Sequence, residues 1–204
     1  MDFNQEIFSA NPAGTMEKLS SKRVFIAGAG GLGSNVAMML ARSGVGFLSI
    51  ADFDKVAPSN LNRQFFFTDQ VRQSKVSALA DNLRRAIPTV RLGLHEDKLT
   101  PENMPFLIPE NVDVICECFD NPECKAQITE FALTQRGNIP LVTVSGLSGY
   151  GDLSSMKIDK RGPNWYVIGD GSSEATVDGT ISTRVTFAAA MQAHTVVRIL
   201  LECR

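Results

Sequence analysis

Residues 23–33 read Arg23-Val24-Phe25-Ile26-Ala27-Gly28-Ala29-Gly30-Gly31-Leu32-Gly33, and this stretch decides the fold. Its apolar part, residues 24–27, is typical of a buried strand and ends in the pattern Gly28-x-Gly30-x-x-Gly33. An amphipathic segment follows from Ser34 to Ser43, and Gly44 is placed to end a helix. A strand, a glycine turn and a helix in this order form a site for nucleotide phosphates, because glycine lets the backbone approach and the helix N-terminus offers free N–H groups. A tight turn without a ligand has the same pattern, so the nucleotide and its chemistry depend on the rest of the chain.

The length and composition predict one soluble domain. The 204 residues suffice for a substantial core, and 44% hydrophobic with 21% charged residues is typical of a globular protein. A net charge of −2 argues against nucleic-acid binding, which needs a clustered basic surface. No apolar run approaches a membrane span, and the acidic start lacks the pattern of a signal peptide. We expect a single cytoplasmic domain over residues 1–204, with residues 1–22 as a lead-in and with no membrane or nucleic-acid partner.

The spacing of the four cysteines predicts no structural zinc site. Cys116, Cys118, Cys124 and Cys203 form no Cys-x-x-Cys pair, so we expect no structural zinc. Cys116 and Cys118 share one face of a strand-like run and are expected to be buried, reduced thiols. Cys124 lies in the first turn of an expected helix, where a thiol pKa can fall, which gives the hypothesis that it accepts sulfur. A packed, inert cysteine is the alternative.

Apolar runs and helical periodicity predict alternating strands and helices after the glycine turn. Strands are expected at residues 47–51, 90–94, 112–117, 139–144, 151–158 and 165–168, and helices at 34–43, 75–87, 122–136 and 182–203. Residues 55–74 and 169–180 are expected to be loops, and a long loop in a compact α/β domain is usually functional. This alternation predicts a Rossmann-like, doubly wound α/β fold with a mostly parallel sheet and helices on both faces.

Polar residues follow the expected strands. Asp52 ends the second strand, 19 residues beyond Gly33, close to where a nucleotide-binding fold places a carboxylate for the ribose. Asp120 follows the fourth expected strand. Because ligands of parallel sheets lie beyond the carboxyl ends of the strands, we expect Gly28, Asp52 and Asp120 to share one crevice.

Two classes of nucleotide-binding protein compete at this point. A dinucleotide oxidoreductase would use the glycine turn for pyrophosphate and Asp52 for ribose, but it also needs a site that handles hydride. An ATP-using enzyme needs cations for the triphosphate and a carboxylate for Mg²⁺. Arg63 and Lys75 supply the cations and Asp120 the carboxylate, so the sequence favours ATP with Mg²⁺.

The motifs together resemble those of the ThiF/MoeB family, the bacterial relatives of ubiquitin-activating enzymes. The resemblance covers roughly residues 20–145 and rests on Gly28-x-Gly30-Gly31-Leu32-Gly33-Ser34, Asp52-Phe53-Asp54, Ser59-Asn60-Leu61-Asn62-Arg63-Gln64, Lys75 and Asp120-Asn121. The order and spacing of these motifs are far more specific than the glycine pattern alone. The compact length and the alanine-rich ending resemble most the short ThiF branch, which adenylates the sulfur carrier ThiS.

The resemblance implies an activity and a set of site residues. The implied nucleotide site consists of Gly28, Gly30, Gly31, Gly33, Asp52, Asp54, Asn60, Arg63, Gln64 and Lys75. Asp52 would bind the ribose, Arg63 and Lys75 the polyphosphate, and Asp120 the Mg²⁺, which makes Arg63, Lys75 and Asp120 the implied catalytic residues. The C-terminal glycine carboxylate of a ThiS-like, ubiquitin-like sulfur carrier would attack the α-phosphate of ATP and release pyrophosphate, in thiamine biosynthesis. No general base is needed, because the carboxylate is already ionised.

Departures from the longer relatives leave alternatives open. A homodimer is implied by the family, but the N-terminal arginine motif that reaches a partner's ATP site is not evident. Residues 169–180 contain no cysteine, so covalent sulfur transfer is left open. The other functions to weigh are activation of a MoaD-like carrier or of a modified tRNA base, a non-catalytic carrier-binding module and a nicotinamide-dependent oxidoreductase. The missing basic extension counts against tRNA, and the set of Arg63, Lys75 and Asp120 counts against a non-catalytic module.

Overall fold

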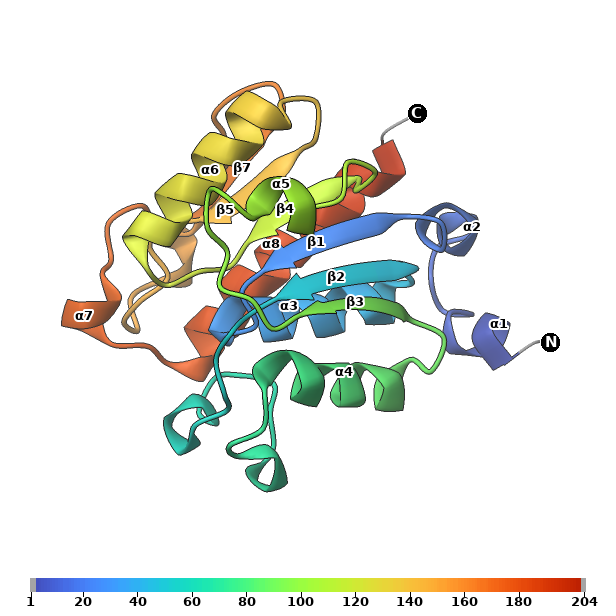
Figure 1. Cartoon of the computed structure of the whole chain (residues 1–204), viewed down its shortest axis with the longest axis horizontal. Coiled ribbons are helices and arrows are strands. Elements are labelled where there is room, and N and C mark those ends of the chain that lie inside the picture. Colours follow the sequence, from blue (N-terminus) through green and yellow to red (C-terminus); the bar gives the residue numbers. More distant parts are fainter. Residues whose placement is uncertain (1–2, 203–204) are drawn as a thin grey trace.

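A single seven-stranded sheet forms the centre of the computed structural model, which describes residues 3–202. The strand order is β3-β2-β1-β4-β5-β7-β6. The strands are β1 (Arg23–Ala27), β2 (Phe47–Ala51), β3 (Arg91–His95), β4 (Val114–Glu117), β5 (Leu141–Val144), β6 (Lys157–Lys160) and β7 (Trp165–Gly169). Every pairing from β3 to β7 is parallel, and β6 pairs antiparallel with β7 (Figure 1). The doubly wound, mostly parallel sheet predicted from the sequence is therefore confirmed.

Helices cover both faces of this sheet (Figure 1). One face carries α3 (Gly31–Ser43), α4 (Lys75–Ala86) and α8 (Ser182–Glu202), and the other carries α5 (Met104–Leu107) and α6 (Pro122–Gln135). The short helices α1 (Phe3–Ile7) and α2 (Thr15–Leu19) precede β1, and α7 (Ala175–Asp178) lies between β7 and α8. Over residues 3–202, no helix is long and apolar enough to cross a membrane.

Two hydrophobic cores follow from the alternation of side chains along the strands. In β1, Val24 and Ile26 belong to the core under α3, α4 and α8, while Phe25 and Ala27 belong to the core under α5 and α6. All four side chains are fully buried, as expected for a central strand with helices on both sides. The continuous apolar run in the sequence therefore reflects burial on both faces.

The winding of the chain reverses next to β1. From β1 the chain proceeds outward to β2 and β3, then returns to β4 on the other side of β1 and continues to β5. In open parallel sheets, this switch point leaves a crevice outside the carboxyl ends of the two central strands. The glycine turn follows β1 and the segment 118–121 follows β4, so both lie at this edge of the sheet.

Several predicted boundaries are corrected by the structure. Helix α3 begins at Gly31 rather than at Ser34, because the backbone N–H of Ser34 already donates to the Gly30 oxygen at 3.0 Å. The strand predicted over residues 151–158 is wrong: Leu153–Ser155 form a 3₁₀ turn, and β6 begins only at Lys157. The predicted loop 169–180 contains α7, and α5 was not predicted. Of the helix predicted over residues 182–203, Cys203 lies outside the described residues.

Candidate nucleotide site

The glycine turn between β1 and α3 has room for no side chain larger than hydrogen at its centre. Gly28 adopts a φ of +100°, a conformation that glycine tolerates without strain. A Cβ placed on Gly33 would lie 1.8 Å from the Gly28 carbonyl oxygen. The backbone of the turn is therefore packed directly against the start of α3, whose first N–H groups face outward at a helix N-terminus. This arrangement suits a phosphate group.

Asp52 connects the end of β2 to this turn. Its Oδ2 accepts a hydrogen bond from the Ala29 N–H at 2.7 Å, and its Oδ1 accepts one from the Asp54 N–H at 2.8 Å. The side chain is partly buried, and each carboxylate oxygen retains a second lone pair for a further donor. Asp52 therefore both holds the turn in place and offers acceptors to a ribose hydroxyl.

Arg63 lies against the start of α3. Its Cγ and Cδ lie 3.6 and 3.7 Å from the position of a Cβ on Gly31, and its Nη1 donates to the Ser59 carbonyl and to Asn62 Oδ1. Asn35 of α3 donates to the backbone oxygens of both Gly31 and Arg63, at 2.7 and 2.9 Å. The functional loop predicted over residues 55–74 is therefore bound to the glycine turn.

Gln64 and Asn60 belong to the same loop but have different surroundings. The Gln64 side chain is buried next to Gly30, and its Oε1 has no hydrogen-bond partner among the described residues. Burying a hydrogen-bond acceptor without a donor costs free energy, so we expect a ligand or a water molecule to donate to this oxygen. Asn60 uses its own Oδ1 to accept from the Ala57 N–H at 2.8 Å, so it shapes the loop.

Lys75 at the start of α4 is paired with Asp54. The Nζ–Oδ2 distance is 2.7 Å, and the lysine side chain is buried while the Asp54 side chain is half exposed. Asp54 also accepts through its backbone oxygen from the Lys75 N–H at 2.9 Å. A polyphosphate that binds Lys75 would therefore compete with Asp54 for the ammonium group.

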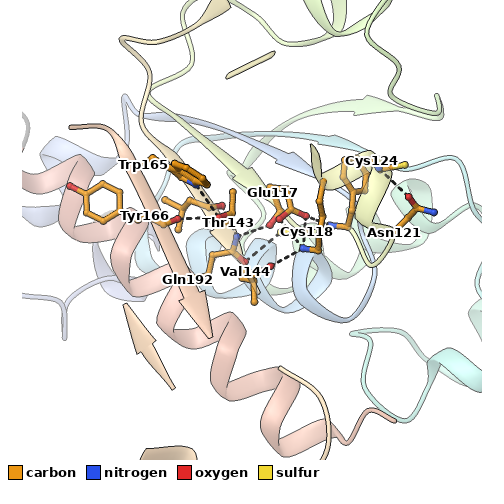
Figure 2. A network of polar contacts seen from close by, with 12 residues as sticks. Glu117, Cys118, Asn121, Cys124, Thr143, Val144, Trp165, Tyr166 and Gln192 are labelled. Atoms are coloured by element: carbon orange, nitrogen blue, oxygen red, sulfur yellow. Dashed lines mark hydrogen bonds and ion pairs between the residues drawn. The ribbon is translucent and has the colours of Figure 1, made fainter. Parts of the chain in front are cut away.

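Asp120 is exposed on the turn between β4 and α6. The next residue, Asn121, caps α6 by accepting from the backbone N–H groups of Glu123 and Cys124 at 2.9 and 3.0 Å (Figure 2). No group of three or more His, Cys, Asp or Glu residues is placed to hold a metal within residues 3–202. A single carboxylate fits Mg²⁺, which commonly binds one or two carboxylates, phosphate oxygens and water.

The cysteines near this turn have contrasting environments. Cys116 and Cys118 are buried and unpaired as disulfides, which confirms the predicted buried thiols, and burial raises the pKa of both. Cys124 in the first turn of α6 is partly exposed. The hypothesis that Cys124 accepts sulfur stays a prediction.

Two polar residues of α3 were given no role by the sequence analysis. The Ser34 hydroxyl donates to the Gly30 oxygen at 2.6 Å and accepts from the Phe65 N–H at 2.9 Å, and Asn35 makes the bonds described above. Ser34 and Asn35 are nevertheless buried in an otherwise apolar helix. Adjacent buried polar residues directly after a glycine turn are a signal that a loop from elsewhere is bound there.

The glycine turn, its bond to Asp52 and the reversal of winding define a Rossmann-like α/β domain with a site suited to a nucleotide. A comparison with sequence families shows which one: the ThiF family matches residues 4–204, and the chain belongs to it. The family resemblance inferred from the motifs is therefore confirmed.

Related proteins align with about two thirds of this chain. It is 39% identical over 139 residues to the adenylyltransferase and sulfurtransferase MOCS3 of Caenorhabditis briggsae, which is 68% of this chain and 34% of that protein. It is 29% identical over 144 residues to the tRNA threonylcarbamoyladenosine dehydratase of Escherichia coli, 70% of this chain and 53% of that one. The matched region thus spans about a third to a half of these relatives' lengths.

Solved structures confirm the fold. The Escherichia coli dehydratase in complex with ATP superposes with a TM-score of 0.86 at 19% identity, covering 97% of this chain and 93% of that chain. Escherichia coli MccB with ATP has a TM-score of 0.73 at 20% identity, covering 91% and 57%.

Proposed function

We propose that this protein adenylates the C-terminal carboxylate of a small ubiquitin-like sulfur carrier of the ThiS type. In this reaction a carboxylate oxygen attacks the α-phosphorus of ATP. The bond between the α-phosphorus and the oxygen that bridges to the β-phosphate breaks, pyrophosphate departs, and an acyl-adenylate is formed. The observation that carries the proposal is the glycine turn held by Asp52 and contacted by Arg63 at the switch point of the sheet. Membership of the ThiF family and an adenylyltransferase among its relatives support the same chemistry.

The nucleotide would lie across the edge of the sheet. Its phosphates would face the turn from Gly28 to Gly33, and its ribose would face Asp52. Gln64 Oε1, which has no donor within residues 3–202, would gain one from the bound nucleotide or its water. Arg63 and Lys75 would neutralise the phosphate charge, with Lys75 released from Asp54, and Asp120 would hold Mg²⁺. When bound, Mg²⁺ would draw negative charge from the phosphate oxygens.

The attacking group needs no proton acceptor. A carboxylate is ionised at neutral pH, so the protein has only to align the reactants and stabilise the charge that spreads over the phosphate oxygens. Preorganised cations and backbone N–H groups do this without reorganisation during the reaction.

A second candidate function is activation of a modified base in tRNA. It is favoured by the dehydratase structure, 93% of which is covered by this chain. The net charge of −2 counts against a tRNA substrate. The two functions differ in what triggers pyrophosphate release, so substrate-dependent exchange of radiolabelled pyrophosphate into ATP distinguishes them.

The test combines substrates and variants. The protein is incubated with ATP and MgCl₂ together with ThiS-like carriers, MoaD-like carriers or bulk tRNA. The mass of each carrier is then measured by mass spectrometry to detect an added AMP. We expect AMP on a ThiS-like carrier. AMP on a MoaD-like carrier would redirect the carrier assignment, and pyrophosphate exchange with tRNA alone would replace the proposal by the second candidate.

Alanine variants of Arg63, Lys75 and Asp120 test the site itself. Each is expected to slow carrier-dependent pyrophosphate exchange by about 10²–10³-fold while leaving carrier affinity unchanged, because each charge faces phosphate or metal. Arg85→Ala is the matched control, since Arg85 is exposed in the same helix as Lys75. Near-normal exchange in all three variants, or a loss explained by weaker carrier binding, would place the adenylation site elsewhere.

A further inference from the structure

A buried carboxylate lies directly beneath the turn that carries Asp120. Glu117 is the last residue of β4, and its side chain is only 1% exposed. Its Oε1 accepts a hydrogen bond from the backbone N–H of Phe119 at 2.7 Å (Figure 2). The carboxylate therefore fixes the peptide between Cys118 and Phe119, one residue before Asp120.

Lys125 balances the charge of Glu117 and connects it to a third element. Its Nζ lies 2.9 and 2.8 Å from the two carboxylate oxygens of Glu117, and it also donates to the backbone oxygen of Val144 at 2.9 Å. Lys125 belongs to α6 and Val144 ends β5. One ammonium group thus joins the end of β4, the first half of α6 and the end of β5.

The backbone before the turn is held from the opposite face of the sheet. The Gln192 side chain of α8 donates to the Glu117 carbonyl at 2.9 Å and to the Val142 carbonyl at 3.0 Å. The Cys118 N–H donates to Ala27 of β1 at 2.9 Å. The turn from Cys118 to Asn121 therefore leaves the sheet from a fixed origin and enters α6 at a fixed cap, with exposed Asp120 between them.

Stability alone does not account for such a pair. The Glu117 side chain is buried, while that of Lys125 is 28% exposed. Removing a carboxylate from water costs several kcal/mol, and apolar replacements of such ion pairs are often as stable. Burial raises the pKa of Glu117, and the Lys125 ammonium opposes that rise. What an apolar pair would not supply is the hydrogen bond to Phe119 and the bond to Val144, which set the position of the turn.

We propose that Glu117 and Lys125 are positioning residues that hold the turn carrying Asp120 in the geometry required by nucleotide-bound Mg²⁺. This inference rests on the proposed function, because it assumes that Asp120 meets the metal. In this role Glu117 and Lys125 need no contact with the nucleotide. They act through the backbone of Phe119 and the start of α6.

The experiment compares ATP binding with and without metal. The dissociation constant of ATP is measured by calorimetry in MgCl₂ and again in EDTA for the wild-type protein, Lys125→Met, Lys125→Arg and Asp120→Ala. We expect Lys125→Met to weaken binding in MgCl₂ by about 10- to 100-fold, the usual effect of losing a group that orients a metal ligand, and to leave binding in EDTA unchanged. Lys125→Arg should restore most of the affinity in MgCl₂.

A double variant tests whether Lys125 acts through Asp120. Adding Asp120→Ala to Lys125→Met should weaken binding in MgCl₂ no further, because both changes remove the same metal interaction. If Lys125→Met fails to fold, the Glu117→Gln, Lys125→Gln double variant, which buries no charge, takes its place. Equal weakening in EDTA and MgCl₂, or additive losses, would overturn the positioning role.

The controls separate this inference from the proposed function. If Asp120→Ala loses the magnesium-dependent affinity and Lys125→Met does not, only the positioning role fails. If the wild-type protein binds ATP no better with Mg²⁺, or Asp120→Ala binds as the wild type does, then the metal assignment of the proposed function and this inference both fail.

Discussion

Asp52 has two simultaneous tasks at the level of single residues. Both of its carboxylate oxygens accept backbone N–H groups, one from Ala29 in the glycine turn and one from Asp54. The same oxygens are the acceptors available to a ribose. Loss of the side chain would therefore remove the proposed ribose contact and also release the turn from its bond to Asp52.

Replacing Asp52 by alanine should weaken ATP binding by about 1–3 kcal/mol, the usual cost of leaving hydrogen-bonded partners unmatched. Calorimetric titration with ATP measures this directly. Asp97→Ala is the matched control, because Asp97 is an exposed acid after the neighbouring strand. Unchanged ATP affinity in Asp52→Ala would remove this residue from the site.

At the scale of elements, the glycine pattern allows the turn after β1 to pack closely against α3. Gly33 is the position where helix and turn approach most closely, because any Cβ there would meet the Gly28 carbonyl. The pattern in the sequence is thus explained first by packing. The outward-facing N–H groups are a consequence of that packing.

A Gly33→Ala variant should lower the free energy of unfolding by about 1–3 kcal/mol, the usual range for overpacking. Urea denaturation followed by circular dichroism gives the value. Gly162→Ala is the control, since a Cβ there would have its nearest contact at 3.9 Å, with Trp165. A Gly33→Ala variant as stable as this control would contradict the close approach.

A second contact between elements depends on pH. Asp170 follows β7 and pairs with Arg184 of α8, and both side chains are buried. Burial raises the pKa of Asp170, but hydrogen bonds from Ser173, Ser172 and Arg184 outweigh it and hold this pKa well below its usual range. A carboxylate with a depressed pKa in the folded state stabilises the fold above its unfolded pKa of about 3.9, and this stability is lost as the pH falls below that value.

The Asp170→Asn variant should therefore differ most from the wild type near neutral pH. We expect its deficit in melting temperature to stay level from pH 7 to about pH 5 and to shrink as the pH falls below about 4, because only the wild type loses stability from this group. Asp159→Asn, which alters an exposed pair with Arg161, should melt close to the wild type. A pH-independent deficit in Asp170→Asn would show that the charge of Asp170 is not responsible.

At the scale of the whole molecule, sequence reasoning succeeded where structure is local. The glycine turn was predictable because residues adjacent in the sequence form it, and the position of Asp52 was predictable because it directly follows the apolar run of β2. The pair of Lys125 and Glu117 was not predictable, because Lys125 also binds the backbone oxygen of Val144, which is distant in sequence. The predicted strand over residues 151–158 failed because Asp152 accepts from the Ser154 N–H and bends the chain into a turn.

The site residues follow the same division. The placement of Gly28, Asp52 and Asp120 at one edge follows from parallel strands alone. The loop of residues 55–74, which carries Arg63, is held by Ser34 and Asn35. Hydrophobic periodicity in the sequence does not predict such a contact. The pairing of Lys75 with Asp54 was likewise not predicted.

The exposed apolar side chains bear on how two copies could assemble. The family resemblance implies a homodimer, but the small residues of the last helix offer no surface for it, because Ala188, Ala189 and Ala193 are buried within the chain itself. The side chains of Tyr150 and Val177 are apolar and exposed. Their two segments are joined by a hydrogen bond from the Gly149 N–H to the Gly179 oxygen. We still propose a homodimer, and expect light scattering to give about twice the chain mass of 22.2 kDa. A fully active monomer at micromolar concentration would contradict it.

The outermost strand β6 restricts how such a dimer can be built. Its residues Lys157–Lys160 are all exposed, and three of the four carry a charge. Short, charged edge strands resist pairing with the edge of another sheet, because like charges would be brought into register along the shared ladder. Two copies are therefore disfavoured from joining through β6 into one continuous sheet. The same property protects this edge of the sheet against the strand-to-strand association that begins aggregation.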